Sequence, residues 1–422
     1  MLVHFFVNGS TTSAAGERAS RIARELHQRG AVTRLIVRDS SRLGAIRSMV
    51  DAALRERPDA IYCMDFAVAP VLATCLSRRA TRVVIDTGDA PSEFLELIEA
   101  PIASRIAMRG IERLGYWRAN AMVVRGIHHR AMLERAGVRC EIHIVEDGVD
   151  LEPMAQADGV AIRQRLGLHD EFVVGLQGNF TWYDQLGGGM GWEVVRALAD
   201  AGQPNWRALF IGEGPGIARL TDLAVELGVE QQLICTGKVA LAELPSYLNV
   251  VDVAVLTQTN DPSSWVRTTG KLPCYLACGK PVVASRVGTA ASLLPETMLV
   301  DYDGHWDRGY PQRLAERLGW WSEAGRAKDA AGAMRELAQR FDYPTIAKRA
   351  ATIAVRGLGL IRPESAASAA STASASSTSG TESSAITASQ LVPATKAAAP
   401  MPSSTGLDVS AQSRVDRSER AA

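Results

Sequence analysis

Short apolar runs alternate with longer helical patterns over residues 1–360. The runs cover residues 2–7, 32–37, 59–63, 82–86, 121–124 and 142–145 in the first part of the chain, and residues 172–177, 207–211, 233–236, 252–256, 281–285 and 297–300 in the second. Between the first two runs, Ala19, Ile22, Ala23 and Leu26 recur at helical spacing, and Gly30 predicts the end of that helix. Strands that alternate with helices predict an α/β fold with parallel sheets.

Six runs in each half predict two Rossmann-like doubly wound domains that face each other across a cleft. We expect the first domain over residues 1–150 and the second over 165–330. Residues 331–360 contain an amphipathic pattern and are expected to form helices that pack back across the junction. Residues 363–422 are rich in alanine and serine and poor in large apolar side chains, which predicts a disordered tail.

Charge and cysteine content exclude several classes of protein. The 46 basic residues equal the 46 acidic residues, which argues against a general nucleic-acid binder. The six cysteines (positions 63, 75, 140, 235, 274 and 278) form no CxxC pair, so neither a metal site nor a disulfide framework is expected. There is no run of eighteen apolar residues, and the N-terminus lacks the basic opening of a signal peptide. These features predict a cytoplasmic protein.

Two glycine turns follow predicted strands. Gly9 lies directly after the first strand, where backbone amides could hold an anion or simply form a tight turn. Residues 212–216 read GEGPG, but Ile217 stands where a dinucleotide fingerprint needs glycine. No GxxxxGK[ST] motif occurs either. The sequence therefore argues against NAD, FAD and P-loop nucleotide chemistry.

Residues 263–285 hold the most informative segment. Hydroxyl side chains, Gly270 and Lys271 precede a short helix that ends at Gly279, before a buried strand. Backbone amides, a helix dipole and a lysine at one point predict an anion site of the size of a diphosphate. The alternative is a polar loop with a solvated lysine.

Five motifs together resemble one family. They are VEDGVD (145–150), GLQGN (175–179), FIGEGP (210–215), TGKV (236–239) and KLPCYLACGKPVVAS (271–285). In this order they are similar to the motifs of nucleotide-sugar glycosyltransferases with the GT-B fold, in particular glycosyltransferase family 4 (group 1). The resemblance covers about residues 145–290; the first half of the chain is similar mainly in its layout.

The resemblance implies that a sugar moves from a nucleotide-sugar, used as co-substrate, to a glycan, lipid-linked or small-molecule acceptor bound by the first domain. It further implies retention of stereochemistry, no other cofactor and no tightly bound metal. Lys271 would stabilise the leaving diphosphate, with Arg267 as a second cation. The other donor-binding candidates are Gly9, Gly178, Asn179, Gly212, Gly214, Val239, Thr268, Thr269, Gly270 and Cys274.

Two departures from the family pattern leave alternatives open. Cys274 stands where the family's helix usually carries a glutamate, and residues 180–184 lack the basic residue that many members carry. The alternative to an active transferase is a weakened homologue that serves as a nucleotide-sugar- or glycan-binding partner subunit. A nucleotide-sugar epimerase is a third interpretation, less favoured because GKPVVAS fits the transferases better.

Candidates in the first half are less specific. Asp86 and Asp89 follow a strand end, where Asp86 could meet an acceptor hydroxyl or cap a loop. Arg125 is expected to point toward the cleft, and the pair His128-His129 is expected to be solvated or to cap a helix.

Residues 102–118 carry Arg105, Arg109 and Arg113 four apart among apolar residues. A basic amphipathic helix of this kind can lie on an anionic membrane, such as the inner face of the plasma membrane. An ordinary surface helix is the other interpretation.

Overall fold

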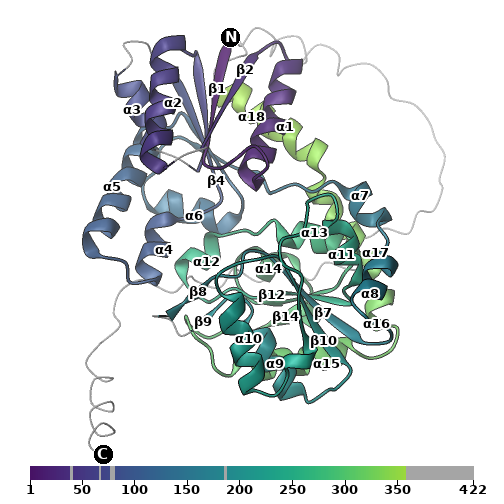
Figure 1. Cartoon of the computed structure of the whole chain (residues 1–422). Helices are drawn as coiled ribbons and strands as arrows, with labels where there is room; N and C mark the ends of the chain where they lie inside the picture. Colours follow the sequence, from purple (N-terminus) through teal and green to yellow (C-terminus); the bar gives the residue numbers. More distant parts are fainter. Residues whose placement is uncertain (39–40, 66–67, 77–80, 185–187, 358–422) are drawn as a thin grey trace, which may run out of the picture. The chain divides into compact units, whose positions relative to one another are not determined.

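The computed structural model describes residues 1–38, 41–65, 68–76, 81–184 and 188–357, which belong to one compact unit. Two six-stranded parallel sheets with helices around them form this unit (Figure 1). The sheets confirm the predicted pair of Rossmann-like, doubly wound folds. The predicted tail over residues 363–422 lies outside the described residues.

The first sheet has the strand order β2-β1-β3-β4-β5-β6. Its strands are β1 (Leu2–Val7), β2 (Val32–Val37), β3 (Ala60–Met64), β4 (Arg82–Thr87), β5 (Ala121–Val124) and β6 (Glu141–Ile144). All neighbours pair in parallel, with Leu2 opposite Val32 and Val7 opposite Val37. The central strand β3 is buried along its whole length, as its apolar composition predicts.

Helices cover both faces of this sheet. They are α1 (Ala14–Gln28), α2 (Arg42–Glu56), α3 (Val68–Leu76), α4 (Pro91–Leu97), α5 (Ile102–Arg118) and α6 (Ile127–Arg135). The Ser13 hydroxyl accepts a hydrogen bond from the Gly16 amide and caps α1, whose predicted apolar positions are buried. In the part of the chain that the structure describes, no helix is long and apolar enough to cross a bilayer.

The second sheet has the order β11-β10-β7-β12-β13-β14. Its strands are β7 (Phe172–Gln177), β10 (Trp206–Ile211), β11 (Leu233–Cys235), β12 (Val253–Leu256), β13 (Val282–Ser285) and β14 (Leu299–Val300). An antiparallel hairpin of β8 (Trp182–Tyr183) and β9 (Gly188–Gly189) was not predicted. Its strands of two residues are too short to show a period of hydrophobic positions.

The helices of the second half are more numerous. They are α7 (Leu151–Gln156), α8 (Val160–Arg165), α9 (Trp192–Ala201), α10 (Ile217–Glu226), α11 (Leu244–Val250), α12 (Pro262–Val266), α13 (Lys271–Ala277), α14 (Gly288–Leu293), α15 (Tyr310–Trp321), α16 (Arg326–Asp329) and α17 (Ala331–Ala338). Short 3-10 turns occupy Glu230–Gln232, Glu296–Met298 and Gln339–Phe341.

The last described helix, α18 (Tyr343–Gly357), returns to the first sheet and packs beside α1 (Figure 1). Its buried residues Ile346, Ala350 and Ala354 share a hydrophobic core with Phe5 of β1 and Leu26 of α1. The small alanines allow α18 to approach α1 closely, so the last helix of the described chain completes the core of the first sheet.

Candidate functional site

The carboxyl ends of β7 and β12 lie where the strand order of the second sheet reverses. Along the chain β7 comes first, β10 and β11 extend the sheet on one side of it, and β12, β13 and β14 extend it on the other. Open α/β sheets bind ligands at such a switch point, in the crevice outside the strand ends. The loops that leave β7 and β12 are therefore the natural place for a functional site.

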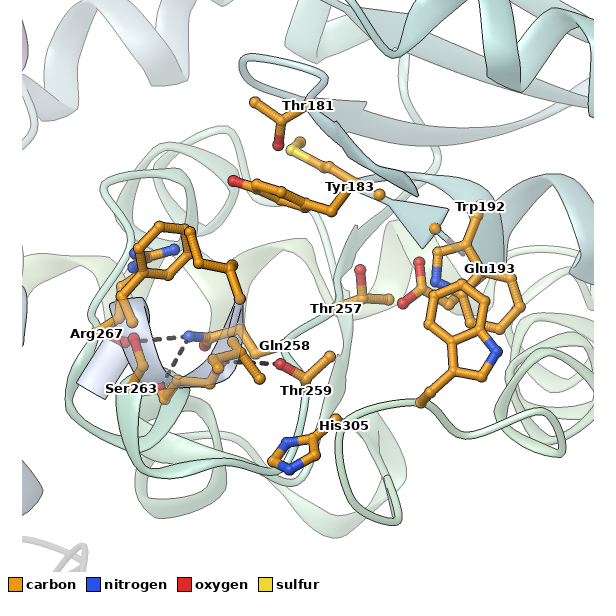
Figure 2. Close-up of a pocket in the computed structure, with 18 of the residues that line it drawn as sticks. Thr181, Tyr183, Trp192, Glu193, Thr257, Gln258, Thr259, Ser263, Arg267 and His305 are labelled. Carbon is orange, nitrogen blue, oxygen red and sulfur yellow. Dashed lines mark hydrogen bonds between the residues drawn. The ribbon is translucent and has the colours of Figure 1, made fainter. Parts of the chain in front are cut away.

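A cavity of about 460 Å³ opens at this switch point (Figure 2). Asn179 and Thr181, after β7, and Thr257, Gln258 and Thr259, after β12, form part of its wall. Other lining residues come from α4, the β8–β9 hairpin, α9, α12 and later loops: Phe94, Leu97, Ile98, Tyr183, Met190, Trp192, Glu193, Ser263, Ser264, Arg267, Thr269, Lys271, His305 and Trp306. The volume is within the usual range of about 300–1,000 Å³ for a small-molecule site.

Lys271, the first residue of α13, places its amino group in this wall. The Nζ atom lies 3.2 Å from the sulfur of Met190, and no carboxylate of the described residues forms an ion pair with it. Burial, and then the nearby charge of Arg267, lower the pKa of the Lys271 ammonium to about 8. A cation without a counter-charge beside a cavity favours an anionic ligand.

The residues just before Lys271 also have unused hydrogen-bonding capacity. The hydroxyls of Thr268 and Thr269 are buried and have no partner among the described residues. Thr269 lines the cavity, whereas Thr268 lines a small adjoining pocket with Arg125. Gly270 is exposed and is the N-cap residue of α13. Buried hydroxyls are normally hydrogen-bonded, so these two also favour a polar ligand.

Arg267 supplies a second positive charge on the cavity wall. Its Nε atom lies 3.0 Å from the Asp89 carboxylate, and its guanidinium stacks over the Phe94 ring at 5.3 Å from the centroid. The Gln258 side chain donates hydrogen bonds to the backbone carbonyls of Ser264 and Arg267, and so fixes the segment that carries the arginine (Figure 2). The structure therefore brings Asn179, Arg267, Thr269 and Lys271 to one cavity.

Gly212 and Gly214 were predicted to bind the donor, but in the structure they pack against the loop after β7. Both have positive φ angles, and a Cβ atom would lie 2.0 Å from the Gly178 oxygen at position 212 and 2.1 Å from the Phe180 oxygen at 214. Neither lines the cavity. The two glycines let the loop after β10 lie directly on the loop after β7. That contact positions Gly178, which itself packs against the side chains of Met190 and Lys271.

Three other predicted donor residues lie outside the cavity lining. Gly9 turns the chain between β1 and α1, where a Cβ atom would meet the Ser13 hydroxyl at 2.4 Å. Val239 packs against the core of the second sheet. Cys274 is half-buried in α13, and burial raises the pKa of its thiol to about 12. A neutral thiol therefore stands at this position, not an anionic one.

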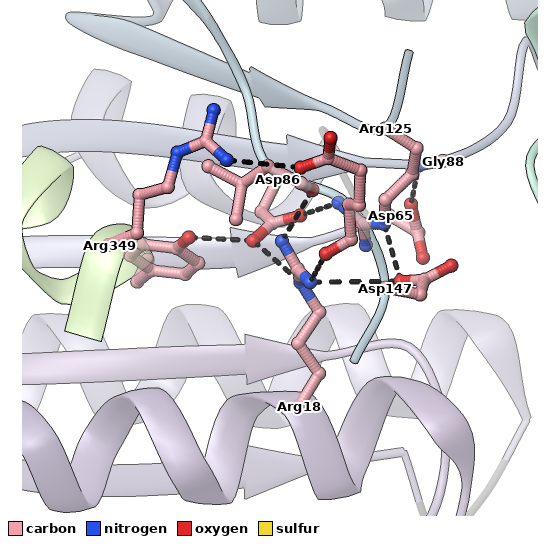
Figure 3. A network of polar contacts seen from close by, with 10 residues as sticks. Arg18, Asp65, Asp86, Gly88, Arg125, Asp147 and Arg349 are labelled. Carbon is pink, nitrogen blue, oxygen red and sulfur yellow. Dashed lines mark hydrogen bonds and ion pairs between the residues drawn. The ribbon is translucent and has the colours of Figure 1, made fainter. Parts of the chain in front are cut away.

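Asp86 belongs to a buried ion network and not to the cavity (Figure 3). Its carboxylate is fully buried, pairs with Arg18 at 3.1 Å and with Arg125, and accepts a hydrogen bond of 2.6 Å from the Tyr62 hydroxyl. Burial opposes ionisation, but Arg125 and Arg18 outweigh it and hold the pKa of Asp86 below its ordinary value. The geometry gives Asp86 no access to an acceptor hydroxyl, so it supports a structural role and not the catalytic one predicted.

The same network reaches the segment that joins the two sheets. Arg125 bonds Asp147 at 2.7 Å, and Arg18 donates to the Glu146 carbonyl at 2.7 Å. Glu146 in turn pairs with Arg340 and Arg349 at 2.9 and 3.1 Å. The VEDGVD motif is therefore held in place by arginines from both ends of the described chain.

The histidine pair is buried, so the prediction that it would be solvated or would cap a helix is wrong. The His128 ring meets the Trp265 ring edge to face at 4.6 Å. His129 is fully buried, and neither ring nitrogen has a hydrogen-bond partner among the described residues. Burial, together with Arg125, lowers the pKa of His129 to about 4. The contact between His128 and Trp265 joins α6 to α12.

Several residues that line the cavity were not predicted from the sequence. Thr257, Gln258 and Thr259 directly follow a strand that was predicted, and the switch-point rule applied to that strand would have found them. Glu193, His305 and Trp306 carry no such signal, because only the packing of α9 and the loop after β14 brings them to the cavity. Among the described residues no group of three or more His, Cys, Asp or Glu side chains could hold a metal ion.

Comparison with known proteins gives a family match for the region around this cavity. The family model of Glycosyl transferases group 1 matches residues 171–318. The 2-deoxystreptamine glucosyltransferase of Streptomyces kanamyceticus is 28% identical over 151 residues, which are 35% of this chain and 37% of that protein. The GDP-mannose-dependent alpha-(1-6)-phosphatidylinositol monomannoside mannosyltransferase of Mycolicibacterium smegmatis is 33% identical over 160 residues, which are 36% and 39% of the two chains. The chain thus spans less than two fifths of the length of these relatives.

Solved structures resemble a much larger part of the chain. HepE of Anabaena in complex with UDP-glucose superposes with a TM-score of 0.64 at 19% identity, over 84% of this chain and 99% of that chain. Sucrose-phosphate synthase of Thermosynechococcus elongatus superposes with a TM-score of 0.67 at 17% identity, over 85% and 99%. These similarities confirm the expected GT-B architecture.

Proposed function

We propose, from the match of residues 171–318 to the family model of group 1 glycosyl transferases, that the protein transfers a sugar from a nucleotide-sugar donor to an acceptor hydroxyl. One observation carries the proposal. The Lys271 ammonium, without a carboxylate partner among the described residues, lines a cavity at the switch point of the matched sheet. A nucleoside diphosphate supplies the anion that this position lacks.

In the proposed reaction the bond between the anomeric carbon and the diphosphate oxygen breaks, and the acceptor oxygen bonds to that carbon. The acceptor proton is released, and the nucleoside diphosphate leaves with additional negative charge. Lys271 and Arg267 stabilise this charge, and the Asn179 and Thr269 side chains orient the diphosphate. We propose that the stereochemistry at the anomeric carbon is retained, as the family resemblance implies.

The named relatives support a nucleotide-sugar as donor. One is described as GDP-mannose-dependent, and HepE of Anabaena has been solved with UDP-glucose. The two described acceptors, 2-deoxystreptamine and a phosphatidylinositol mannoside, are a small polar molecule and a lipid-linked glycan. We propose an acceptor that enters the cavity beside Phe94, Leu97 and Ile98, at the end of α4 and just beyond it.

Helix α5 favours a lipid-linked acceptor. Ile102, Ile106 and Trp117 expose 67%, 65% and 78% of their surface, and Arg109 and Arg113 lie on the same helix. Apolar side chains with basic neighbours bind anionic bilayers through burial and charge. We propose that α5 holds the protein at the cytoplasmic face of a membrane.

A thermal-shift experiment tests the donor site. The wild type, Lys271→Ala and the control Lys238→Ala are heated with UDP, GDP, ADP, dTDP and their sugars. At least one nucleotide is expected to raise the melting temperature of the wild type and of the control but not of Lys271→Ala. Lys238 is a suitable control because its side chain is 80% exposed and pairs only loosely with Glu213, at 3.7 Å. A wild type that responds to no nucleotide contradicts the proposal.

A second candidate function is that of a partner subunit that binds a nucleotide-sugar without transferring the sugar. The neutral Cys274 thiol, where the family usually has a glutamate, is the observation that favours it. Release of nucleoside diphosphate that depends on an added acceptor supports the transferase. Binding without release, over a panel of polar and lipid-linked acceptors, supports the partner subunit.

A further inference from the structure

Glu193 has an unusual position for a carboxylic acid. It is the second residue of α9, yet only 4% of its surface is exposed, and it lines the cavity together with Thr257 (Figure 2). Gly191, the N-cap residue of α9, has a positive φ of 101° and joins strand β9, which lines the cavity, to the start of this helix.

The carboxyl group lacks the partners that a buried acid normally has. The Tyr302 hydroxyl donates to Oε1 at 3.4 Å, a long contact, and Oε2 has no partner among the described residues. No lysine or arginine of the described residues forms an ion pair with it. Burial raises the pKa of Glu193 to about 7, so the group is largely neutral below that pH. A neutral acid can donate one hydrogen bond and accept another.

The surroundings of Glu193 suit a polyhydroxylated ring. The Trp192 and Trp306 rings stack at 4.0 Å between centroids, and Thr257, Thr259 and His305 add polar groups to the same cavity. The stacked rings close one side of the cavity, while the hydroxyl, imidazole and carboxyl groups can bond the hydroxyls of a sugar ring. Lys271 lines the same cavity, so a sugar here can be attached to a diphosphate that Lys271 holds.

We propose that Glu193 binds a hydroxyl of the transferred hexose and thereby selects donors that carry that hydroxyl. The inference rests on the proposed function, because it assigns the sugar-binding part of the same donor site. A site that hydrogen-bonds a hydroxyl rejects an analogue without it, because its own polar group is then left unpaired. Glu193 is thus a specificity-determining residue for the donor sugar.

The test compares binding of a nucleoside diphosphate with binding of its sugar, by calorimetry on the full chain. The probes are UDP and UDP-glucose, then GDP and GDP-mannose. The variants are Glu193→Leu, which fills the space without a hydrogen bond, Glu193→Gln, which retains a donor and an acceptor, and the control Asp200→Asn, an exposed acid on the same helix. Glu193→Leu is expected to weaken nucleotide-sugar binding about tenfold and to leave nucleoside-diphosphate binding unchanged. Glu193→Gln is expected to recover most of the loss.

Other outcomes contradict the inference in distinguishable ways. If Glu193→Leu weakens UDP and UDP-glucose equally, Glu193 only supports the structure of the site. If Glu193→Leu changes neither, Glu193 does not contact the sugar. In both cases the proposed function stands, because the wild type still binds the nucleotide. A wild type that binds none of these four probes and responds to no nucleotide of the thermal-shift panel overturns the proposed function and this inference together.

Discussion

Arg267 and Asp89 form an ion pair, 3.0 Å from Nε to Oδ1, that joins the segment before α13 to the loop after β4. Both side chains are partly exposed, at 40% and 51%. The pair places a carboxylate of the first sheet on one of the two cations that we assign to the donor diphosphate. Asp89 and the diphosphate therefore compete for the same guanidinium.

Removal of this competitor is expected to strengthen nucleotide binding. Asp89→Asn frees Arg267, and since partly exposed ion pairs are worth about 0.2–1 kcal/mol, affinity for the nucleoside diphosphate should rise about 1.4- to fivefold. Calorimetry with the nucleotide found in the thermal-shift screen measures this change in affinity. The control is Asp222→Asn, on the exposed face of α10. A weaker affinity in Asp89→Asn would show that Asp89 orients Arg267 for the ligand.

The pH dependence of nucleotide binding should report Lys271. Its pKa is lowered to about 8 by burial and by Arg267, so its charge is present below about pH 8 and is lost above it. Affinity for the nucleoside diphosphate is expected to fall between about pH 7 and pH 9.5. Lys271→Arg should keep the affinity at high pH, because arginine stays charged. Equal pH profiles for the two proteins would contradict the assignment of Lys271.

Glu193 should destabilise the protein near neutral pH. Its pKa is about 7 in the folded state against 4.5 in the unfolded state, so the unfolded chain releases the proton first as the pH rises. Stability is then lost between about pH 4.5 and pH 7, by about 3 kcal/mol in full. Glu193→Gln is expected to recover this amount at pH 8 and nothing at pH 4. Urea unfolding at the two pH values measures the free energy of unfolding of both proteins. An equal effect of Glu193→Gln at both pH values would contradict the assignment of Glu193 as a buried acid with a raised pKa.

Asp86→Asn separates a structural from a catalytic role. The substitution leaves Arg18 and Arg125 without part of their counter-charge inside the first sheet, which is expected to cost about 3–5 kcal/mol of unfolding free energy. The control Asp51→Asn removes a partly exposed acid of α2 and should cost less than about 1 kcal/mol. A variant with normal stability and no transferase activity would instead restore Asp86 as a catalytic residue.

Membrane binding by α5 is tested with vesicles. The double variant Ile106→Ser, Trp117→Ser removes two of its most exposed apolar side chains and is expected to abolish co-sedimentation with phosphatidylglycerol vesicles. Val225→Ser, an exposed apolar residue of α10, is the control. Vesicles of phosphatidylcholine alone should bind the wild type less, because the arginines of α5 need an anionic surface. No binding of the wild type would leave α5 an ordinary surface helix.

Hydrophobic periodicity was sufficient to predict the two sheets. Buried parallel strands are short apolar runs between helices, and β1 and β7 match their predicted bounds. The β8–β9 hairpin was not predicted because contacts with distant residues stabilise it. Gly188, for example, packs so closely on the Trp306 ring that a Cβ atom there would overlap the ring. Local sequence does not encode a partner so distant in the chain.

The site was predictable where one segment carries the chemistry. Lys271 and Thr269 lie together in sequence and in the cavity. Asp86 could not be assigned correctly, because Arg18, which neutralises it, is 68 residues away. Glu193 reads in sequence as an ordinary acid near the start of a helix, where acids are common. Its burial depends on tertiary packing alone.

The return of α18 to the first sheet also orders events during synthesis. The core shared by β1 and α1 includes Ile346 and Val355, although the sixth strand of that sheet ends at Ile144. When the ribosome has made the first sheet, one face of it therefore has α1 but still lacks α18. The second sheet, whose strands and helices are continuous in the chain, can be completed before that helix emerges. The nascent first sheet thus exposes apolar surface for as long as the second sheet takes to be translated.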